Sequence, residues 1–150
     1  MAKPLEIIAI GSDHAGFLMK EYLIKILVGW GYEVKDFGTF SEERMDYPDP
    51  IHPLANAVEH GEYGRGVIIC GSGNGVAMVA NKYPHVRAAL CWEEEIVKLA
   101  RQHNDANIIS IPARFVSNVL AADMVHLFLT TDFEGGRHEE RVKKISETIQ

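Results

Sequence analysis

One stretch of the chain decides its fold: Gly66-Val67-Ile68-Ile69-Cys70-Gly71-Ser72-Gly73-Asn74-Gly75. It begins as an apolar run rich in β-branched residues, reaches a cysteine, and passes directly into a loop with three glycines. The residues that follow, 76–82, have the pattern of a helix. A strand, a glycine loop and a helix in this order are typical of an α/β sheet. Because the amides of such a loop can hold an anion, the stretch also marks a candidate site.

The segments on both sides repeat this alternation of strand and helix. Strands are expected at residues 5–10, 32–37, 67–70, 86–91 and 107–111, and helices at 14–30, 54–59, 76–82, 93–102, 115–130 and 137–149. The polar residues 39–49 predict a loop, with Pro48 and Pro50 marking a turn. The pattern therefore predicts one doubly wound α/β domain over residues 1–150, with a five-stranded parallel sheet in a three-layer, Rossmann-like arrangement and helices on both faces.

The composition limits the classes of function. Of the 150 residues, 47% are apolar and 24% charged, which is ordinary for a globular protein. A net charge of −6 is unlike that of a general nucleic-acid binder, and no apolar run approaches the ~20 residues that span a bilayer. The first residues lead into a strand without the apolar region of a signal peptide. Two cysteines without a disulfide framework favour a reducing compartment, so a cytoplasmic protein without nucleic-acid or membrane partners is expected.

Ligands of such sheets bind beyond the carboxyl ends of the strands, where the strand order reverses. The residues expected there are Ser12-Asp13-His14, Cys70 to Gly75, Trp92-Glu93 and Pro112-Ala113-Arg114. Gly11 and Gly16 have the spacing of a phosphate loop, but Phe17-Leu18 replaces the Lys-Ser/Thr that a nucleoside triphosphate site needs. Asp13 can belong to the site or simply cap the following helix.

Cys70 has two interpretations. A thiol beside a helix N-terminus can be reactive, whereas many free cysteines are small buried apolar residues. Cys91, which no glycine loop follows, is expected to be of the second kind. The loop after Cys70 lacks the G-x-G-x-x-G spacing of dinucleotide sites, and its three glycines exceed what a turn needs, which favours an anion or oxyanion cradle. A redox role has little support because there is no C-x-x-C pair.

Two further clusters carry candidate chemistry. Residues 101–107 end a helix with polar side chains, among which His103 can be a helix cap or a proton donor. Arg137 and Arg141 are four residues apart, on one face of a helix's first turn, where each cation costs ~0.3–1 kcal/mol. A bound phosphate would reverse that cost, although pairing with Glu134, Glu139 or Glu140 is the alternative. The other histidines show no ligand spacing, so no metal site is predicted.

In combination and order, these motifs resemble the type B ribose-5-phosphate isomerases, a family that also contains the allose- and galactose-6-phosphate isomerases. The matching segments are Ser12–Gly16, Asp46–Pro48, Ile69–Gly75, Ala80–Lys82, Arg101–Asn107 and Glu134–His138. They run from the first strand to the last helix. The resemblance implies a cofactor-free aldose–ketose isomerase of the non-oxidative pentose phosphate pathway, which interconverts ribose 5-phosphate and ribulose 5-phosphate through a cis-enediol.

The resemblance also implies roles for individual residues. Cys70 is the proton-transfer base, Ser72 supplies a hydroxyl, His103 is the acid that opens the sugar ring, and Asp13 orients the sugar. The substrate-binding residues are His14, Gly71, Gly73, Asn74, Gly75, Asn104, Arg114, Arg137 and Arg141, with the two last forming a phosphate clamp. Some members use a glutamate at the far end of the loop as the base, but Val76 occupies that position here. The chain departs from many members at Pro112, where they have a glycine.

Members of the family share their sites across a homodimer, and some form tetramers. The resemblance therefore implies that His103 and Asn104 serve the neighbouring subunit. Two alternatives stay open at this point. The same machinery would suit an isomerase of six-carbon sugar phosphates such as allose 6-phosphate, and a sugar-phosphate-binding module without catalysis would share the phosphate-binding residues.

Overall fold

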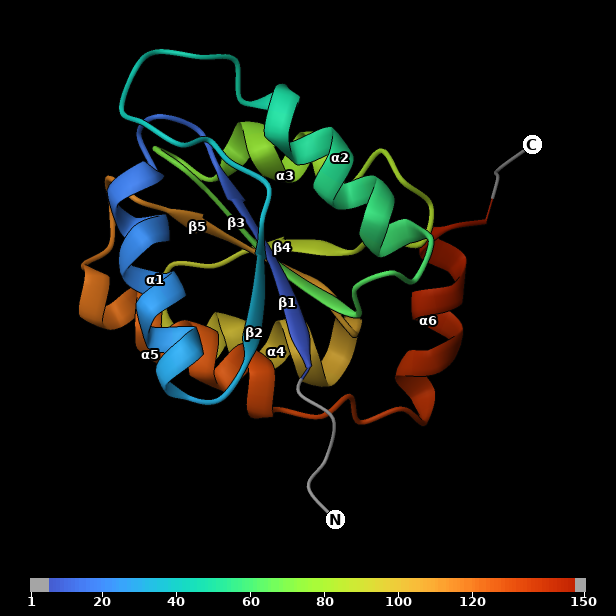
Figure 1. Cartoon of the computed structure of the whole chain (residues 1–150). Helices are drawn as coiled ribbons and strands as arrows, with labels where there is room; N and C mark the ends of the chain where they lie inside the picture. Colours follow the sequence, from blue (N-terminus) through green and yellow to red (C-terminus); the bar gives the residue numbers. More distant parts are fainter. Residues whose placement is uncertain (1–5, 148–150) are drawn as a thin grey trace.

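The computed structural model describes residues 6–147 and places helices on both faces of a parallel sheet (Figure 1). The strands, in the order β2-β1-β3-β5-β4, are β1 (Ile7–Ser12), β2 (Glu33–Asp36), β3 (Arg65–Cys70), β4 (Ala88–Leu90) and β5 (Ile108–Pro112). The helices are α1 (Phe17–Gly29), α2 (Pro48–Glu59), α3 (Asn74–Ala80), α4 (Glu94–Asn104), α5 (Asn118–Thr130) and α6 (Arg137–Ile145). The expected doubly wound α/β fold with five parallel strands is confirmed.

Most boundaries lie within a few residues of those expected, and α2 is the main exception. It begins at Pro48, whereas the sequence pattern predicted a start at residue 54 and a turn at Pro48 and Pro50. That interpretation was wrong because proline is tolerated in the first turn of a helix, where the amide hydrogen has no partner to lose. Residue 5 of the first expected strand and residues 148–149 of the last expected helix lie outside the described part of the chain.

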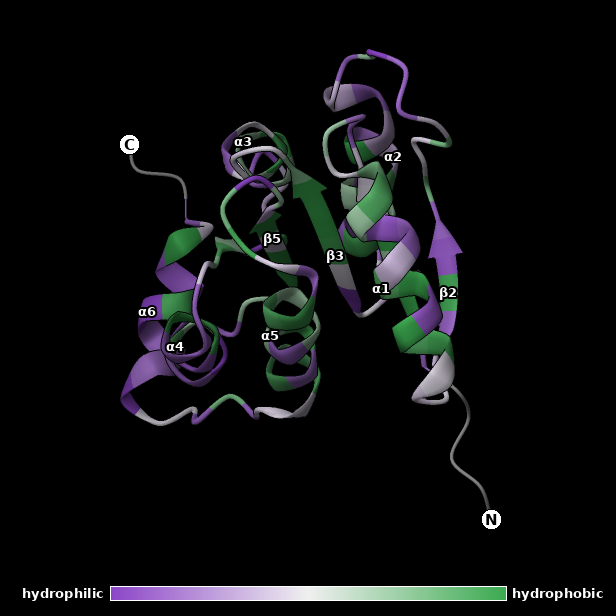
Figure 2. Cartoon of the chain, turned by 90° about the vertical axis from the view of Figure 1, so that its left-hand side faces the viewer, coloured by the Kyte–Doolittle hydropathy of each residue, from purple (hydrophilic) through white to green (hydrophobic). Residues whose placement is uncertain are grey.

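The two faces of the sheet bury separate cores. Helices α1, α4 and α5 cover one face and contact Val67 and Ile69 of β3, whereas α2 and α3 cover the other and contact Ile68 and Cys70. This alternation follows from the two-residue period of a strand. Figure 2 shows β3 as an apolar strand between helices and α6 as a largely hydrophilic helix beside α4. The thiol of Cys70 therefore lies on the side of α2 and α3.

The strand order reverses between β1 and β3, which are neighbours in the sheet. From β1 the chain crosses through α1 to the edge strand β2, and then through α2 to β3 on the other side of β1. Ser12 pairs with Ile69, so the residues that follow β1 lie beside Cys70. Ligands of open α/β sheets bind at this reversal. Within residues 6–147, none of the helices has the length and apolarity to cross a membrane.

Candidate functional site

The centre of the candidate site is the thiol of Cys70, the last residue of β3. Its side chain is buried, and its Sγ accepts a hydrogen bond from the amide of Gly73 at 3.1 Å. The loop can turn back toward the sulfur because Gly73 has a φ of 74°, in the left-handed region that glycine adopts without strain. The buried hydroxyl of Ser110 donates to the carbonyl of Gly73 at 2.7 Å. These contacts hold the thiol and the loop in one fixed arrangement.

The other two glycines of the loop have no side chain, which leaves space for neighbouring side chains to pack against the loop. A Cβ atom on Gly71 would lie 3.1 Å from Nη1 of Arg114, and one on Gly75 would lie 2.7 Å from the ring of Tyr47. Gly71 and Gly75 thus leave room for these two side chains, a reason that differs from the anion cradle expected from the sequence. Arg114 and Tyr47 both lie directly against the loop that follows the thiol.

Two of the loop amides expected to form an oxyanion cradle are hydrogen-bonded within the loop. Gly73 donates to the Cys70 sulfur, and the amide of Asn74 donates to Oγ of Ser72 at 3.2 Å. Ser72 and Asn74 are exposed and line a surface hollow with Leu90, Trp92, Pro112 and Phe115. An incoming oxyanion therefore competes with the sulfur and the hydroxyl for these two donors.

Asp13 and His14 follow β1 and lie on the other side of the strand reversal. Oδ1 of the buried Asp13 accepts from the amide of Gly16 at 2.9 Å, so this carboxylate closes the turn that precedes α1. It is not the N-cap, because that position is held by Gly16 and receives no side-chain cap hydrogen bond. The backbone amide of Asp13 donates to the carbonyl of Ile69, one residue before Cys70. Nδ1 of His14 accepts from the amide of Met45 at 3.4 Å. A neutral His14 in this arrangement carries its proton on Nε2.

Tyr47 and Lys20 are residues whose place the sequence did not reveal. The Asp46–Pro48 segment belonged to the resemblance, but no role was assigned to Tyr47, whose ring covers Gly75. The Nζ atom of the fully buried Lys20 lies 2.8 Å from Oδ2 of Asp36 and 5.4 Å from the centre of the Phe40 ring. Lys20 thus fastens the loop that leads from β2 to Tyr47, and neither packing contact leaves a signal in the residue pattern.

Arg114 reaches the loop despite the preceding Pro112. Its amide donates to the carbonyl of Gly71 at 3.0 Å, and its guanidinium lies against the same residue. Pro112 ends β5 and pairs with Cys70, where the amide of Ala113 donates to the Cys70 carbonyl at 2.8 Å. Cys70, Asp13, His14, the glycine loop and Arg114 are thus gathered at the carboxyl edge of the sheet.

His103, Asn104, Arg137 and Arg141 form a second group, at the end of α4 and the start of α6. The ring of His103 stacks on that of the buried His138, with ring centres 4.3 Å apart and planes 13° apart. Oε1 of Glu134 lies 3.8 Å from Nε2 of His103 and 3.7 Å from Nε2 of His138. Burial, and electrostatic repulsion from the neighbouring His103 and Arg137, lower the pKa of His138, although Glu134 opposes the shift.

Arg137 and Arg141 are exposed at the start of α6. The alternative to a phosphate clamp was pairing with Glu134, Glu139 or Glu140. Within residues 6–147, neither guanidinium lies within ion-pair distance of a carboxylate. Two arginines one turn apart, both open to solvent, can hold a phosphate between them.

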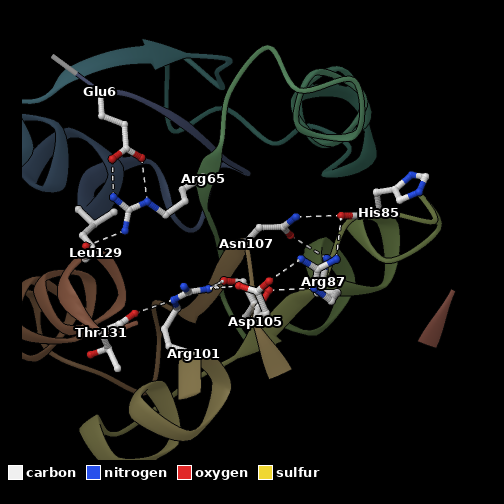
Figure 3. Close-up of polar contacts among 10 residues, drawn as sticks. Glu6, Arg65, His85, Arg87, Arg101, Asp105, Asn107, Leu129 and Thr131 are labelled. Atoms are coloured by element: carbon white, nitrogen blue, oxygen red, sulfur yellow. Dashed lines mark hydrogen bonds and ion pairs between the residues drawn. The ribbon is translucent and has the colours of Figure 1, made fainter. Parts of the chain in front are cut away.

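A polar network around Arg101 and Asp105 fixes this second group (Figure 3). Asp105 follows His103 and Asn104 and ends α4 with a φ of 47°. Its carboxylate accepts from Arg101 at 3.0 Å and from Arg87 at 3.4 Å. Arg101 also donates to the carbonyl of Thr131 at 3.0 Å, in the segment that leads to α6. One guanidinium therefore holds the end of α4 against the approach to Arg137.

Within one chain, the two groups lie at opposite ends of the strands: the Cys70 group at the carboxyl ends and the His103 group at the amino ends. Asn104 ends α4 shortly before β5 begins at Ile108, whereas Cys70 pairs with Pro112 at the far end of that strand. At ~3.3 Å per residue, the strand alone separates these edges by about 13 Å. Figure 1 shows the same relation, with the start of α6 near the amino ends of the strands. The structure therefore brings together each half of the expected site but not the two halves.

Cys91 is an ordinary core residue, as expected. Its side chain is 1% exposed, and burial raises the pKa of its thiol to about 12. A thiol with so high a pKa is almost entirely protonated at neutral pH and makes a poor nucleophile or base.

Comparison with known proteins gives one consistent result. A family model described as ribose/galactose isomerase matches residues 8–145. Ribose-5-phosphate isomerase B from Escherichia coli (strain K12) is 44% identical over 139 residues, which cover 93% of each chain.

Solved structures agree with the family match. The crystal structure of a ribose 5-phosphate isomerase from Thermotoga maritima is 45% identical and has a TM-score of 0.93, covering 95% of this chain and 99% of that one. Ribose-5-phosphate isomerase B from Mycoplasma genitalium, solved with bound ribulose-5-phosphate, is 39% identical with a TM-score of 0.89 and covers 93% of each chain. The likeness extends over nearly the whole chain in each case.

Proposed function

This chain belongs to the ribose/galactose isomerase family, and from that premise we propose that it interconverts ribose 5-phosphate and ribulose 5-phosphate as an aldose–ketose isomerase. The observation that carries the proposal is the thiol of Cys70, aligned by the Gly73 amide at the strand reversal. A thiol at the carboxyl edge of a parallel sheet can move a proton between two neighbouring carbons of a bound sugar. The reaction would serve the non-oxidative branch of the pentose phosphate pathway.

The proposed chemistry moves one proton on carbon and one on oxygen. The thiolate of Cys70 takes the proton from C2 of the open-chain aldose, the C1 carbonyl oxygen gains a proton from the Ser72 hydroxyl, and a cis-enediol forms. The thiol then returns its proton to C1 while the hydroxyl on C2 gives its own proton back to Ser72, which leaves the ketose. Amides of the 71–75 loop and the Ser72 hydroxyl stabilise the charge that develops on the enediol oxygens, and no redox cofactor is needed for the balance.

Asp13, buried beside β3, orients the sugar next to the thiol. His14 donates from Nε2, and the Arg114 guanidinium lies close enough to the loop to support the phosphate. The remaining roles belong to the second half of the site. His103 protonates the ring oxygen as the furanose opens, Asn104 contacts the sugar hydroxyls, and the Arg137–Arg141 pair holds the phosphate.

The separation of the two halves leads us to infer that the protein works as a homodimer with shared sites. The edges that carry Cys70 and His103 are about 13 Å or more apart in one chain, because a whole strand lies between them. A two-fold axis that brings the edge of one copy against the opposite edge of the other completes two sites at once. Each site then uses Cys70 of one copy and His103 of the partner subunit. Two such dimers can form a tetramer without changing this arrangement.

Mixed dimers test the proposal sharply. Cys70→Ala and His103→Ala are each expected to lose nearly all turnover of ribose 5-phosphate. Co-expressed together, they are expected to recover about a quarter of the wild-type activity, because half of the randomly formed dimers are mixed and one of their two sites is intact. A mixture no more active than the separate variants would contradict a shared site.

The size of the sugar needs its own measurement. Ribose 5-phosphate is expected to have a higher kcat/KM than allose 6-phosphate, and the reverse order would make the chain a six-carbon isomerase. Saturable binding of both sugars without turnover would indicate a binding module instead. The two cysteines are free thiols buried at strand ends, which favours the reducing cytoplasm as the place of this activity.

A further inference from the structure

We propose that His103, Glu134 and His138 form a binding site for a divalent transition-metal ion such as Zn²⁺, and that the bound ion stops turnover. The ion would bind Nε2 of His103, the residue that the proposed function uses as the ring-opening acid. The inhibition rests on the proposed function, whereas the binding of the ion does not.

The ligand atoms of the three side chains face one common space. Oε1 of Glu134 lies 3.8 Å from Nε2 of His103 and 3.7 Å from Nε2 of His138, and the ligand atoms of all three residues lie within 4.8 Å of one another. These separations exceed hydrogen-bond lengths. Metal–ligand distances of ~2.0–2.2 Å place neighbouring ligands of a tetrahedral zinc ion roughly 3.3–3.5 Å apart, so the Glu134 contacts need to shorten by only a few tenths of an ångström.

The backbone already holds the three residues near each other. The amide of Glu134 donates to the carbonyl of Gln102 at 3.0 Å, which ties this segment to α4 next to His103. Glu134 and His138 are four residues apart, and the buried His138 is fixed by its surroundings. The stacked rings are nearly parallel, so joint coordination requires His103 to tilt out of the stack. Its partly exposed side chain leaves room for that movement.

The donor set selects the kind of ion. Two imidazoles and one carboxylate suit Zn²⁺, Co²⁺, Ni²⁺ and Cu²⁺, whereas Mg²⁺ and Ca²⁺ prefer sites made of oxygen atoms. Three protein ligands leave the fourth position of a tetrahedral ion for water. The positive charge of Arg137, which precedes His138, weakens the attraction for a cation. We therefore expect reversible binding, weaker than in a closed structural zinc site.

The test measures binding apart from turnover, on the full-length chain. Titration with Co²⁺ is expected to give the visible bands of a tetrahedral ion, and calorimetry with Zn²⁺ is expected to give one ion per chain. Both Glu134→Gln and His138→Gln should weaken the affinity by about tenfold or more, since each removes one of three ligands. Glu134 is half exposed, so its variant keeps the test valid if His138→Gln does not fold. Glu59→Gln is the control, because it removes a carboxylate charge from a His85–Glu59 pair of 2.9 Å that belongs to no cluster of three metal-ligating side chains within residues 6–147.

Inhibition completes the experiment. Zn²⁺ should block turnover of ribose 5-phosphate in the wild type and in Glu59→Gln, with recovery on adding EDTA, and should block Glu134→Gln only at higher concentration. Equal Co²⁺ affinity in wild type, Glu134→Gln and His138→Gln would overturn the proposal. A near-ultraviolet thiolate-to-cobalt band that disappears in Cys70→Ser would also overturn it, because the ion would then lie at the thiol. If the chain turns over no sugar, the binding titrations still decide whether the ion site exists.

Discussion

The sulfur of Cys70 and the amide of Gly73 form a hydrogen bond of 3.1 Å that closes a tight turn at the end of β3. The turn depends on the left-handed backbone of Gly73, where a Cβ would lie 2.5 Å from Leu90. The orientation of the thiol therefore depends on the backbone conformation of Gly73, whose carbonyl also accepts a hydrogen bond from the buried Ser110 hydroxyl.

Replacing the thiol tests its role directly. Cys70→Ala is expected to lower kcat for ribose 5-phosphate by ~10²–10⁴, the usual contribution of a positioned base. Cys91→Ala, which removes the other buried thiol, is the control and should keep its kcat. Steady-state turnover of both variants gives the answer, and full activity in Cys70→Ala would mean that another group is the base.

The two thiols should differ in their reaction with iodoacetamide. Burial raises the pKa of Cys91 to about 12, so at pH 8 only about one molecule in 10⁴ carries that thiolate. We expect mass spectrometry to find the label on Cys70 and not on Cys91 in the folded protein. Labelling of Cys70 should abolish turnover, and saturating ribose 5-phosphate should slow the labelling of this thiol. Faster labelling of Cys91 would show that the core opens more readily than its burial indicates.

The arginine pair of α6 should act on the phosphate alone. Arg137→Ala and Arg141→Ala are each expected to raise KM for ribose 5-phosphate by ~10–100-fold, since a hydrogen bond to a charged group is worth ~1.5–3 kcal/mol. Lys143→Ala, an exposed residue of the same helix, is the matched control. The weak reaction of unphosphorylated ribose should not change. An equal loss with both sugars would contradict the clamp.

Any side chain at Gly75 is expected to impair activity, because the ring of Tyr47 occupies the space that the side chain would need. A methyl group there would lie 2.7 Å from the ring of Tyr47, so Gly75→Ala is expected to displace Tyr47 and lower kcat/KM by about tenfold or more. Gly64→Ala is the control, because no atom lies within 4 Å of its added methyl. Unchanged kinetics in Gly75→Ala would show that the loop before α2 adjusts without effect on the site.

Asp105 separates the effect of backbone conformation from that of charge. Its φ of 47° costs an alanine roughly 1–2 kcal/mol but a glycine almost nothing, so Asp105→Gly should be more stable than Asp105→Ala. Asparagine also adopts this conformation readily. The free energy of unfolding of Asp105→Asn should therefore fall by less than about 1 kcal/mol, because that variant loses only the partly exposed ion pairs. Urea unfolding at one protein concentration checks the order. Greater stability of the alanine variant would indicate that the turn relaxes.

The sequence pattern predicted the fold, and the placement of Cys70 and its glycine loop where β3 ends, because both depend on local signals. An apolar strand that ends at a glycine loop must place that loop at the carboxyl edge of a parallel sheet. The buried state of Cys91 follows from an equally local feature, whereas Asp13 closes the turn before α1 and is not its N-cap. The start of α2 was missed because Pro48 is compatible with both a turn and a first helical turn.

The parts that could not be predicted depend on contacts between distant segments. His103 stacks on His138 only because α6 packs against α4. The ring of Tyr47 contacts Gly75 only because the loop after β2 carries it there. Neither contact corresponds to a recognisable spacing of residues in the sequence. The absence of ligand spacing therefore predicted no metal site, although folding brings His103, Glu134 and His138 together.

The distance between Cys70 and His103 within one chain has a consequence for how activity depends on dilution. A single chain carries two halves that cannot meet, so a dissociated chain is expected to be inert even when fully folded. Below the dissociation constant of the proposed dimer, the fraction of paired chains falls with concentration. Turnover per chain should then fall in proportion, so that the total rate varies with the square of the enzyme concentration. At concentrations well above the dissociation constant, turnover per chain would not depend on concentration. At concentrations far below it, the chain would be folded but nearly inactive.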